Sequence, residues 1–439
     1  MRGPDSTNQL FDQYDRAIEL CYKIWQHHFE FLNLGYAAYL DFFGFMKGEF
    51  PNIPDQAIAK MVQGVDSELF RPDDELKKLA KLAVELDLGD ALATGSVDEA
   101  LAAVAAQPNG AQWIEAWETA KNPWFNFTSG NGFYSTDKYW IDHLDIPMSY
   151  LRDYIDRLND GDEIMRPTER LLAERDRITA EYREMMEPEA QAVFDGKLGL
   201  ARTVFPYVED HNFYIEHWAI GVFWRKMRAL SKLLADQGFW ENEDDMFFLN
   251  RNEVRDVWWD YSSSWAIGVA KRGTDVWPEE IARRRKIYEA LSAQSPAPAL
   301  NNPPEVITEP FTITLWGITS EAIDRWTGGA SEDGILAGMA AAPGIVEGTA
   351  RVLRSPDQLS ELKKGEILVT PVTAPSWAPV FGKIGAAVAD IGGMMSHAAI
   401  VCREYGLPAV TGTGTASSQI KTGMRLRVDG NTGKVTILD

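Results

Sequence analysis

Apolar side chains recur at helical spacing through most of residues 11–292. Between Phe11 and Phe50, for example, Leu20, Ile24 and Phe31 fall on one helical face, and an aromatic-rich run follows them. Proline residues divide the next stretch into shorter helices. The pattern therefore predicts a large, mainly α-helical region.

Capping signals and changes of composition refine this picture. Ser96 precedes an alanine-rich run and is followed three residues later by Glu99, which is the spacing of a capping box. The charged stretch Arg166–Glu187 and the block Glu189–Asp236 also have helical periodicity. By contrast, Asn122–Trp140 mixes Gly, Asn, Ser and Thr with large aromatic residues, which indicates a binding or lid loop.

The pattern changes after a proline-rich stretch. Ser295–Pro310 contains five prolines and predicts a stiff, extended linker. The run TITLWGI at residues 312–318 has the composition of a strand. From residue 333 onward, short β-type runs alternate with turns and at least one helix, which predicts a compact α/β domain. We therefore expect a multidomain protein with a large mainly α-helical domain over residues 1–294, a linker and connecting segment over 295–332, and a small α/β domain over 333–439.

The composition is that of a globular protein with sizeable cores. Of the 439 residues, 45% are hydrophobic, and no apolar run reaches the ~18 residues that span a bilayer. The N-terminal residues lack a basic region followed by a hydrophobic one, so neither export nor membrane insertion is indicated. The two cysteines, Cys21 and Cys402, are typical of a reducing compartment. We expect a cytoplasmic location.

A formal net charge of −22 bears on the choice of partner. Nucleic acids and anionic membranes attract clusters of Lys and Arg, so an acidic chain is a poor match for either. We expect no nucleic-acid partner and no membrane partner. Acidic stretches such as Glu241–Asp245 are solvated faces or surfaces that steer a basic partner subunit, and the sequence leaves both interpretations open.

One histidine stands where a helix of the α/β domain is predicted to begin. Gly392 and Gly393 allow a sharp turn, and Ser396 has the side chain of an N-cap residue. Residues 397–405 then have a helical pattern, so His397 falls in the first turn. Unpaired backbone N–H groups and the helix dipole favour an anion there, including a phosphoryl group on the imidazole. A histidine that only caps or packs the helix is the alternative.

Four segments of the α/β domain carry a family resemblance. They are AAPGIVEGTARVL at 341–353, GEILVTPVTAPSWAPVF at 365–381, the histidine segment at 392–410 and VDGNTGKVTIL at 428–438. In this order they resemble the swivelling phosphohistidine domain of phosphoenolpyruvate-utilising enzymes. That family includes pyruvate phosphate dikinase, phosphoenolpyruvate synthase, rifampin phosphotransferase and phenylphosphate synthase.

The resemblance implies roles for individual residues. It implies that His397 carries the phosphoryl group as a phosphohistidine intermediate, and that Ser396, Thr373 and Arg403 hold the phosphate. Met395 departs from the family pattern, because many members have a threonine there that is a regulatory phosphorylation site in some dikinases. We do not expect that regulation in this chain.

Modules of the larger family members have no counterpart in the sequence. No segment fits the GxxxxGK[ST] loop, and we expect neither an ATP-grasp region before the helical region nor a phosphoenolpyruvate-binding barrel after the histidine domain. The order of a helical domain followed by a histidine domain resembles that of phenylphosphate synthase-like enzymes, whose ATP-binding part lies on a second polypeptide. We expect ATP and Mg²⁺ to bind to a separate ATP-grasp subunit, and we expect no metal site in this chain.

A second group of candidate residues lies in Phe205–Leu230, where polar and aromatic residues share helical spacing. His211, flanked by Glu209 and Asp210, is the candidate general base for a second transfer step, and a structural histidine is the alternative. Plain core is an equally good interpretation of the aromatic stripe. The candidate substrate-binding residues are Tyr214, His217, Trp218 and, from the preceding helix, Arg202.

The distribution of aromatic residues suggests which kind of molecule accepts the phosphoryl group. Residues 205–261 are much richer in aromatic residues than the α/β domain, so we expect the large domain to enclose a small phenolic or aromatic alcohol. We predict an ATP-dependent phosphotransferase subunit that makes an aryl phosphate. A phosphocarrier serving another protein or a non-aromatic molecule, and a scaffolding protein with a vestigial histidine domain, are alternatives. The acceptor's identity, the stoichiometry, and the choice between ADP and the AMP plus phosphate that the resemblance implies stay open.

The missing nucleotide modules generate a first prediction. The isolated chain should neither hydrolyse ATP nor bind it tightly, because it has no recognisable phosphate-binding loop or ATP-grasp region. Isothermal titration calorimetry of the isolated chain with Mg-ATP checks this expectation. A micromolar dissociation constant, roughly −8 kcal/mol, would contradict it.

Overall fold

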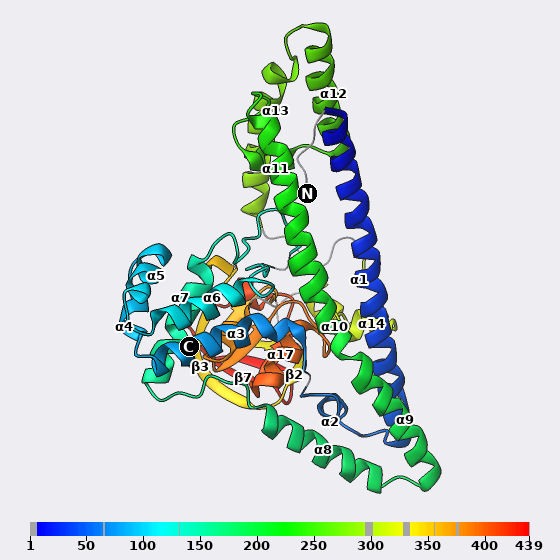
Figure 1. Ribbon diagram of the computed structural model, residues 1–439. Coiled ribbons are helices and arrows are strands. Elements are labelled where there is room, and N and C mark those ends of the chain that lie inside the picture. The colour runs from blue at the N-terminus through cyan, green and yellow to red at the C-terminus, as the bar shows by residue number, and fades with distance from the viewer. Residues whose placement is uncertain are drawn as a thin grey trace. The chain divides into compact units, whose positions relative to one another are not determined.

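Two compact units divide the chain in the computed structural model, which describes residues 7–64, 66–130, 132–294, 302–327, 334–354, 356–374 and 377–438. Unit 1 comprises residues 1–29, 132–137 and 214–297, and unit 2 comprises residues 30–131, 138–213 and 298–439. The predicted fold class is confirmed, because a large helical region precedes a small α/β domain (Figure 1).

Helices build the first part of unit 2. The long helix α1 (Thr7–Glu49) confirms the helix predicted over residues 11–50 and contributes its second part to this unit. Ser96 and Glu99 form the predicted capping box, since each side chain accepts a hydrogen bond from the other residue's backbone N–H. The helices that follow are α2 (Asp55–Lys60), η1 (Glu68–Phe70), α3 (Arg71–Glu85), α4 (Gly89–Leu92), α5 (Val97–Ala105), α6 (Gly110–Lys121), α7 (Asp145–Asn159), α8 (Thr168–Glu184), α9 (Pro188–Val204) and α10 (Pro206–His211).

The loop at residues 122–140 is packed more deeply than the sequence suggested. Phe125, Phe127 and Trp140 are buried, and Trp140 meets both phenylalanine rings edge-on. Burying large apolar rings lowers the free energy of the folded protein, so these side chains belong to the core. Only the tip, with Phe133 and Tyr134, keeps exposed aromatic surface, and this tip belongs to unit 1. The expectation of a lid loop is therefore wrong for the flanks of the segment.

Unit 1 is a helical unit with an aromatic core. Besides the first part of α1, its elements are a π-helix, η2 (Asn212–Ala219), which crosses the unit boundary, and then α11 (Ile220–Ala235), η3 (Glu243–Phe248), α12 (Arg251–Ile267) and α13 (Gly273–Ser292). Asn242 and Asn250 begin η3 and α12 with capping boxes. Its buried core consists of Tyr14, Met227, Leu230, Leu234, Phe239, Trp240, Met246, Val254, Val257, Trp258 and Ile281.

An eight-stranded sheet forms the α/β domain in unit 2. Its strands lie in the order β1-β8-β7-β3-β4-β5-β6-β2. The central strands β3 to β6 are parallel, and the strands on either side of them pair antiparallel. Strands β4 and β5 are buried throughout, as expected for parallel strands that are covered on both faces. The strands are β1 (Ile335–Ala337), β2 (Met339–Ala342), β3 (Ile345–Val352), β4 (Ile367–Thr370), β5 (Ala386–Ala389), β6 (Ala409–Thr411), β7 (Arg425–Asp429) and β8 (Lys434–Ile437).

Short helices accompany the sheet, and one of them corrects a prediction. The run at residues 312–318 is not a strand, because Glu309 accepts hydrogen bonds from the N–H groups of Phe311 and Thr312 and so starts a helical turn. Pro310 at the first helical position favours the same conformation. The helices are α14 (Pro310–Thr314), α15 (Ser320–Thr327), η4 (Pro356–Glu361), α16 (Ala378–Phe381), α17 (His397–Tyr405) and α18 (Ala416–Gln419).

The predicted domain boundaries stay predictions. Residues 295–301 of the predicted linker and residues 328–333, including the start of the α/β domain, lie outside the described residues. In the part of the chain that the structure describes, no helix combines the length and the apolar character needed to cross a membrane. Cys402 is fully buried, and burial raises the pKa of its thiol to about 12, so it remains an unreactive thiol.

Candidate active site

His397 begins α17, as predicted. Ser396 has extended backbone geometry, and its Oγ accepts a hydrogen bond from the Ala399 N–H at 3.4 Å and donates one to the Gly393 carbonyl at 2.8 Å. The helix packs on β2, β5 and β6 and ends at Gly406, which adopts a left-handed conformation (Figure 1). The sheet therefore holds the helix that presents His397 at its first position.

The loop before His397 is fixed by the segment that follows α14. The N–H groups of Gly392, Gly393 and Met395 donate to the carbonyls of Trp316, Leu315 and Thr314 at 3.1, 2.8 and 2.9 Å, in that order. A Cβ atom on Gly393 would lie only 2.1 Å from the Thr314 carbonyl oxygen, so a glycine is required there. These loop donors are thus engaged by backbone carbonyls, and within α17 the Ala399 N–H is engaged by Ser396.

A buried carboxylate from the helical region meets the imidazole of His397. Nδ1 of His397 lies 3.4 Å from Oε2 of Glu209, and the Glu209 side chain is only 4% exposed. A carboxylate accepts hydrogen bonds, so it favours the tautomer with the proton on Nδ1 and the lone pair on Nε2. Nε2 is itself buried, and among the described residues nothing hydrogen-bonds to it. This geometry leaves the lone pair on Nε2.

His211 lies on α10, the helix that also carries Glu209. Its Nδ1 is 2.5 Å from the Tyr207 carbonyl oxygen, so Nδ1–H donates and Nε2 has the lone pair. Burial lowers the pKa of His211 below its ordinary value of 6.5, although the Tyr207 carbonyl and the carboxylates of Glu209 and Asp210 oppose this shift. The imidazole is therefore neutral at physiological pH, as a general base must be.

Asp210 anchors α10 to η1, the short helix before α3. Its Oδ1 accepts a hydrogen bond from the Glu68 N–H at 2.7 Å, while burial raises the pKa of its carboxyl group. Through this hydrogen bond, Asp210 fixes the position of the helix that carries Glu209 and His211.

The predicted phosphate-binding residues have structural contacts of their own. Ser396 caps α17, and Arg403 is buried and donates from one guanidinium nitrogen to the carbonyls of Ala341 (3.0 Å) and Met394 (2.8 Å). Arg403 thereby ties β2 to the loop before His397. Thr373 is buried in the loop after β4. Contact with a phosphoryl group stays a prediction for all three residues.

The predicted substrate-binding residues are divided between the units. Tyr214, His217 and Trp218 lie in unit 1 on the π-helix η2, where the sequence had predicted a regular α-helix. The rings of Tyr214 and Trp218 stack with centroids 6.4 Å apart, and His217 is fully buried. Arg202 lies in unit 2 and donates to the Met61 carbonyl and the Thr179 hydroxyl, both at 2.8 Å. π-Helical segments are frequent at functional sites, but substrate contact stays a prediction.

One residue of the site escaped the sequence analysis. Tyr36, on α1, donates from its hydroxyl to the Met395 carbonyl at 3.0 Å and is almost completely buried. It therefore holds the loop that leads into His397. The only signal in the sequence was a tyrosine within an apolar helical run, since a buried phenol needs a hydrogen-bond partner.

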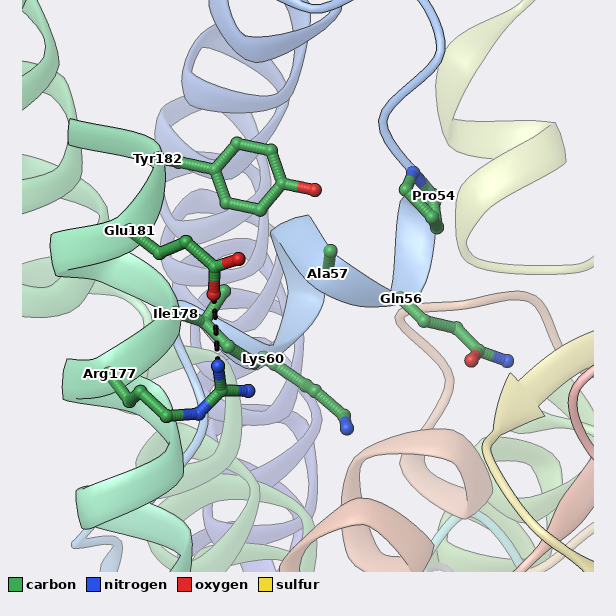
Figure 2. Close-up of a pocket in the computed structure, with 8 residues that line it drawn as sticks. All are labelled: Pro54, Gln56, Ala57, Lys60, Arg177, Ile178, Glu181 and Tyr182. Carbon is green, nitrogen blue, oxygen red and sulfur yellow. Dashed lines mark hydrogen bonds and ion pairs between the residues drawn. The ribbon is translucent and has the colours of Figure 1, made fainter. Parts of the chain in front are cut away.

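An open hollow of about 280 Å³ lies between α2 and α8 (Figure 2). Arg177 and Glu181 form an ion pair in it, and Lys60 pairs with Glu174 beside it. Gln56 donates to the carbonyls of Ala340 and Gly430 and so links α2 to the α/β domain. None of the predicted site residues lines this hollow, so we assign it no part in the chemistry of His397.

Comparison with known proteins identifies the α/β domain. Residues 362–433 match the family described as PEP-utilising enzyme, mobile domain, and this range includes His397 and its helix. The chain carries the mobile domain of PEP-utilising enzymes. The resemblance proposed from its motifs is thereby confirmed.

Several of the proteins that this chain is similar to are phosphotransferases by name. It is 26% identical to an uncharacterized phosphotransferase of Bacillus subtilis, over 69% of this chain and 34% of the relative. It is 33% identical to a rifampicin phosphotransferase of Streptomyces sviceus, over 49% of this chain and 22% of the relative. A probable phosphoenolpyruvate synthase of Staphylothermus marinus is 48% identical over 23% of this chain and 12% of the relative. The chain thus spans 34% or less of the length of these relatives.

The contact between Glu209 and His397 generates a second prediction. Glu209→Leu removes the acceptor at similar volume, so His397 should shift from the Nδ1–H tautomer to a mixture with the Nε2–H form. ¹⁵N NMR of histidine-labelled protein distinguishes the two tautomers. Glu181→Leu, at an exposed position on α8, is the matched control. An unchanged His397 spectrum in Glu209→Leu would show that the carboxylate does not set the tautomer.

Proposed function

We propose that this chain is a phosphotransferase subunit that takes a phosphoryl group from ATP onto His397 and passes it to the hydroxyl of a small phenolic or aromatic alcohol. The observation that carries the proposal is the contact of Glu209 with Nδ1 of His397. It brings a carboxylate of the helical region to the motif histidine of the mobile domain, and it leaves the lone pair on Nε2.

The comparisons support the general class of reaction. The mobile domain matches, and two of the relatives are named as phosphotransferases, one of them for rifampicin. The finer assignment, an aryl-phosphate synthase subunit with a separate ATP-grasp subunit, rests on the sequence motifs and on the aromatic composition of the large region.

The first half-reaction loads His397. The Nε2 lone pair attacks a phosphorus atom of ATP, a P–N bond forms, and the P–O bond to the leaving nucleotide breaks. The proton stays on Nδ1, the nitrogen that Glu209 contacts in the arrangement described here, so the phosphorylated ring carries one proton and one phosphoryl group. ATP and Mg²⁺ are assigned to the partner subunit. Among the described residues, no group of three or more His, Cys, Asp or Glu side chains is placed to hold a metal ion.

The second half-reaction transfers the phosphoryl group to the acceptor. The acceptor oxygen attacks phosphorus, its proton passes to Nε2 of His211, and the P–N bond breaks to release a neutral imidazole. Burial keeps His211 unprotonated and suited to this role, and Asp210 fixes the helix on which it stands. The aromatic composition of residues 205–261 supports an aromatic acceptor, since aromatic rings favour stacking on a flat ligand.

The third prediction tests the phosphohistidine. Incubation with ATP and the ATP-grasp partner should label His397 with phosphate that is stable in alkali, and His397→Ala should remove this label. Phosphopeptide mapping under alkaline conditions locates the phosphate. His143→Ala, at an exposed histidine of unit 2, is the control and should keep the label. Label that survives in His397→Ala would overturn the proposed function.

The fourth prediction separates the two half-reactions. His211→Ala should still accumulate phosphohistidine but discharge it to a phenol at least ~100-fold more slowly, because a general base contributes about 10²–10⁴-fold. Single-turnover experiments measure loading and discharge separately. Because burial lowers the pKa of His211, the wild-type discharge rate should fall to half its maximum at a pH below 6.5, the ordinary value of a histidine.

The outcome also decides between the two candidate functions. Discharge at the wild-type rate in His211→Ala would place the base elsewhere. If proteins or non-aromatic molecules accept the phosphoryl group while phenols do not, the chain is a phosphocarrier.

A further inference from the structure

A buried polar cluster joins the far end of the histidine helix to the helical part of unit 2. Tyr405, the last residue of α17, accepts a hydrogen bond from Lys77 at 3.1 Å and donates one to Asp73 at 3.0 Å. Lys77 and Asp73, both on α3, form an ion pair at 2.5 Å, and Tyr154 on α7 also donates to Asp73. The side chains of Lys77 and Asp73 are 1% and 2% exposed.

Within this cluster, the residues from the helical part of unit 2 bond with one another even without Tyr405. Asp73 and Lys77 are one helical turn apart on α3 and pair with each other, and Tyr154 supplies a further donor to the carboxylate. Burial alone would lower the pKa of Lys77, but the adjacent Asp73 carboxylate outweighs it and keeps the ammonium charged. A buried ion pair with a partner in place avoids the penalty of an isolated buried charge. The mobile domain can therefore withdraw Tyr405 without leaving an unpaired charge behind.

The first residue of α17, His397, gives a reason why Tyr405 at the last position would have to leave this cluster. Nε2 of His397 is buried in this arrangement, so no phosphoryl donor reaches it. Tyr405 lies eight residues further on, about 12 Å along the same helix, so the two ends move together as one rigid element. An arrangement that buries the nucleophile must open before the nucleophile reacts.

We propose that Asp73, Lys77 and Tyr154 form a socket for Tyr405, and that withdrawal of Tyr405 from this socket frees the histidine helix and exposes Nε2 of His397. The proposal deepens the proposed function, on which it rests, by naming the positioning residues that hold the histidine against the helical region.

Other contacts between the same parts include hydrogen bonds from the Gly64 N–H to Glu404 at 2.8 Å and from Arg157 to the Gly382 carbonyl at 2.9 Å, as well as more exposed ion pairs. Lys383 pairs with Asp153, and Lys364 pairs with Asp162, but in each pair one side chain is a third or more exposed to solvent. Exposed ion pairs contribute little to stability because water and salt screen them. The two hydrogen bonds of Tyr405 join a neutral phenol to buried charged groups, and such bonds are the stronger kind. The socket is therefore one of the buried contacts that set how often the helix is released.

Chemical modification of histidine tests the socket without any phosphoryl transfer, so its failure is distinct from failure of the proposed function. Diethyl pyrocarbonate acylates accessible neutral imidazoles, and mass spectrometry gives the rate for each histidine. Tyr405→Phe keeps the ring and removes both hydrogen bonds. We expect His397 to react about 10–100-fold faster in this variant, because the released fraction rises by that factor.

Internal and external controls make the result specific. His143, which is exposed in unit 2, should react at the wild-type rate in Tyr405→Phe, and circular dichroism should show an unchanged helix content. Tyr261→Phe makes the same chemical change in unit 1 and should leave the rate at His397 unchanged. A wild-type rate at His397 in Tyr405→Phe, or an equal acceleration in Tyr261→Phe, would overturn the proposal.

Discussion

The placement of one buried carboxylate determines the chemistry available to His397. An imidazole has two nitrogens, and a nucleophile at Nε2 requires that the proton be held on Nδ1. Glu209 meets that requirement from α10, whereas the histidine itself belongs to the α/β sheet domain. Neither part of the chain fixes the tautomer alone. The packing of the two parts, through Tyr36, Gln56 and Tyr405 among others, therefore sets the tautomer of His397 as well as its position.

Features that depend on neighbouring residues could be predicted from the sequence. The start of α17 follows from two glycines, a serine with capping geometry and an apolar helical pattern, all within residues 392–405. The capping box at Ser96 and the long helix α1 follow from equally local signals. The alternation of strands and turns predicted the α/β domain, because buried parallel strands are short apolar runs between Gly and Pro turns.

Features that depend on tertiary contacts could not be predicted. Glu209 and His397 are 188 residues apart, and no periodicity connects them. The partners of Tyr405 on α3 and α7 are similarly remote, so a tyrosine at the end of a helix gave no hint of an ionic cluster. The run at residues 312–318 was assigned as a strand from its β-branched residues, although capping by Glu309 and the fixed backbone of Pro310 favour a helical turn. The π-helical turn at residues 212–219 has no signature in composition at all.

The close approach of Gly393 to the Thr314 carbonyl has a mechanical consequence. Three backbone hydrogen bonds join residues 314–316 to the loop before His397, and Trp326 donates to the Thr413 carbonyl of the same domain. Ile307 in turn donates from its backbone to the Ser320 hydroxyl. A movement of the histidine helix that keeps these contacts carries residues 307–326 with it. The body that moves is then larger than the sheet, because it includes α14 and α15.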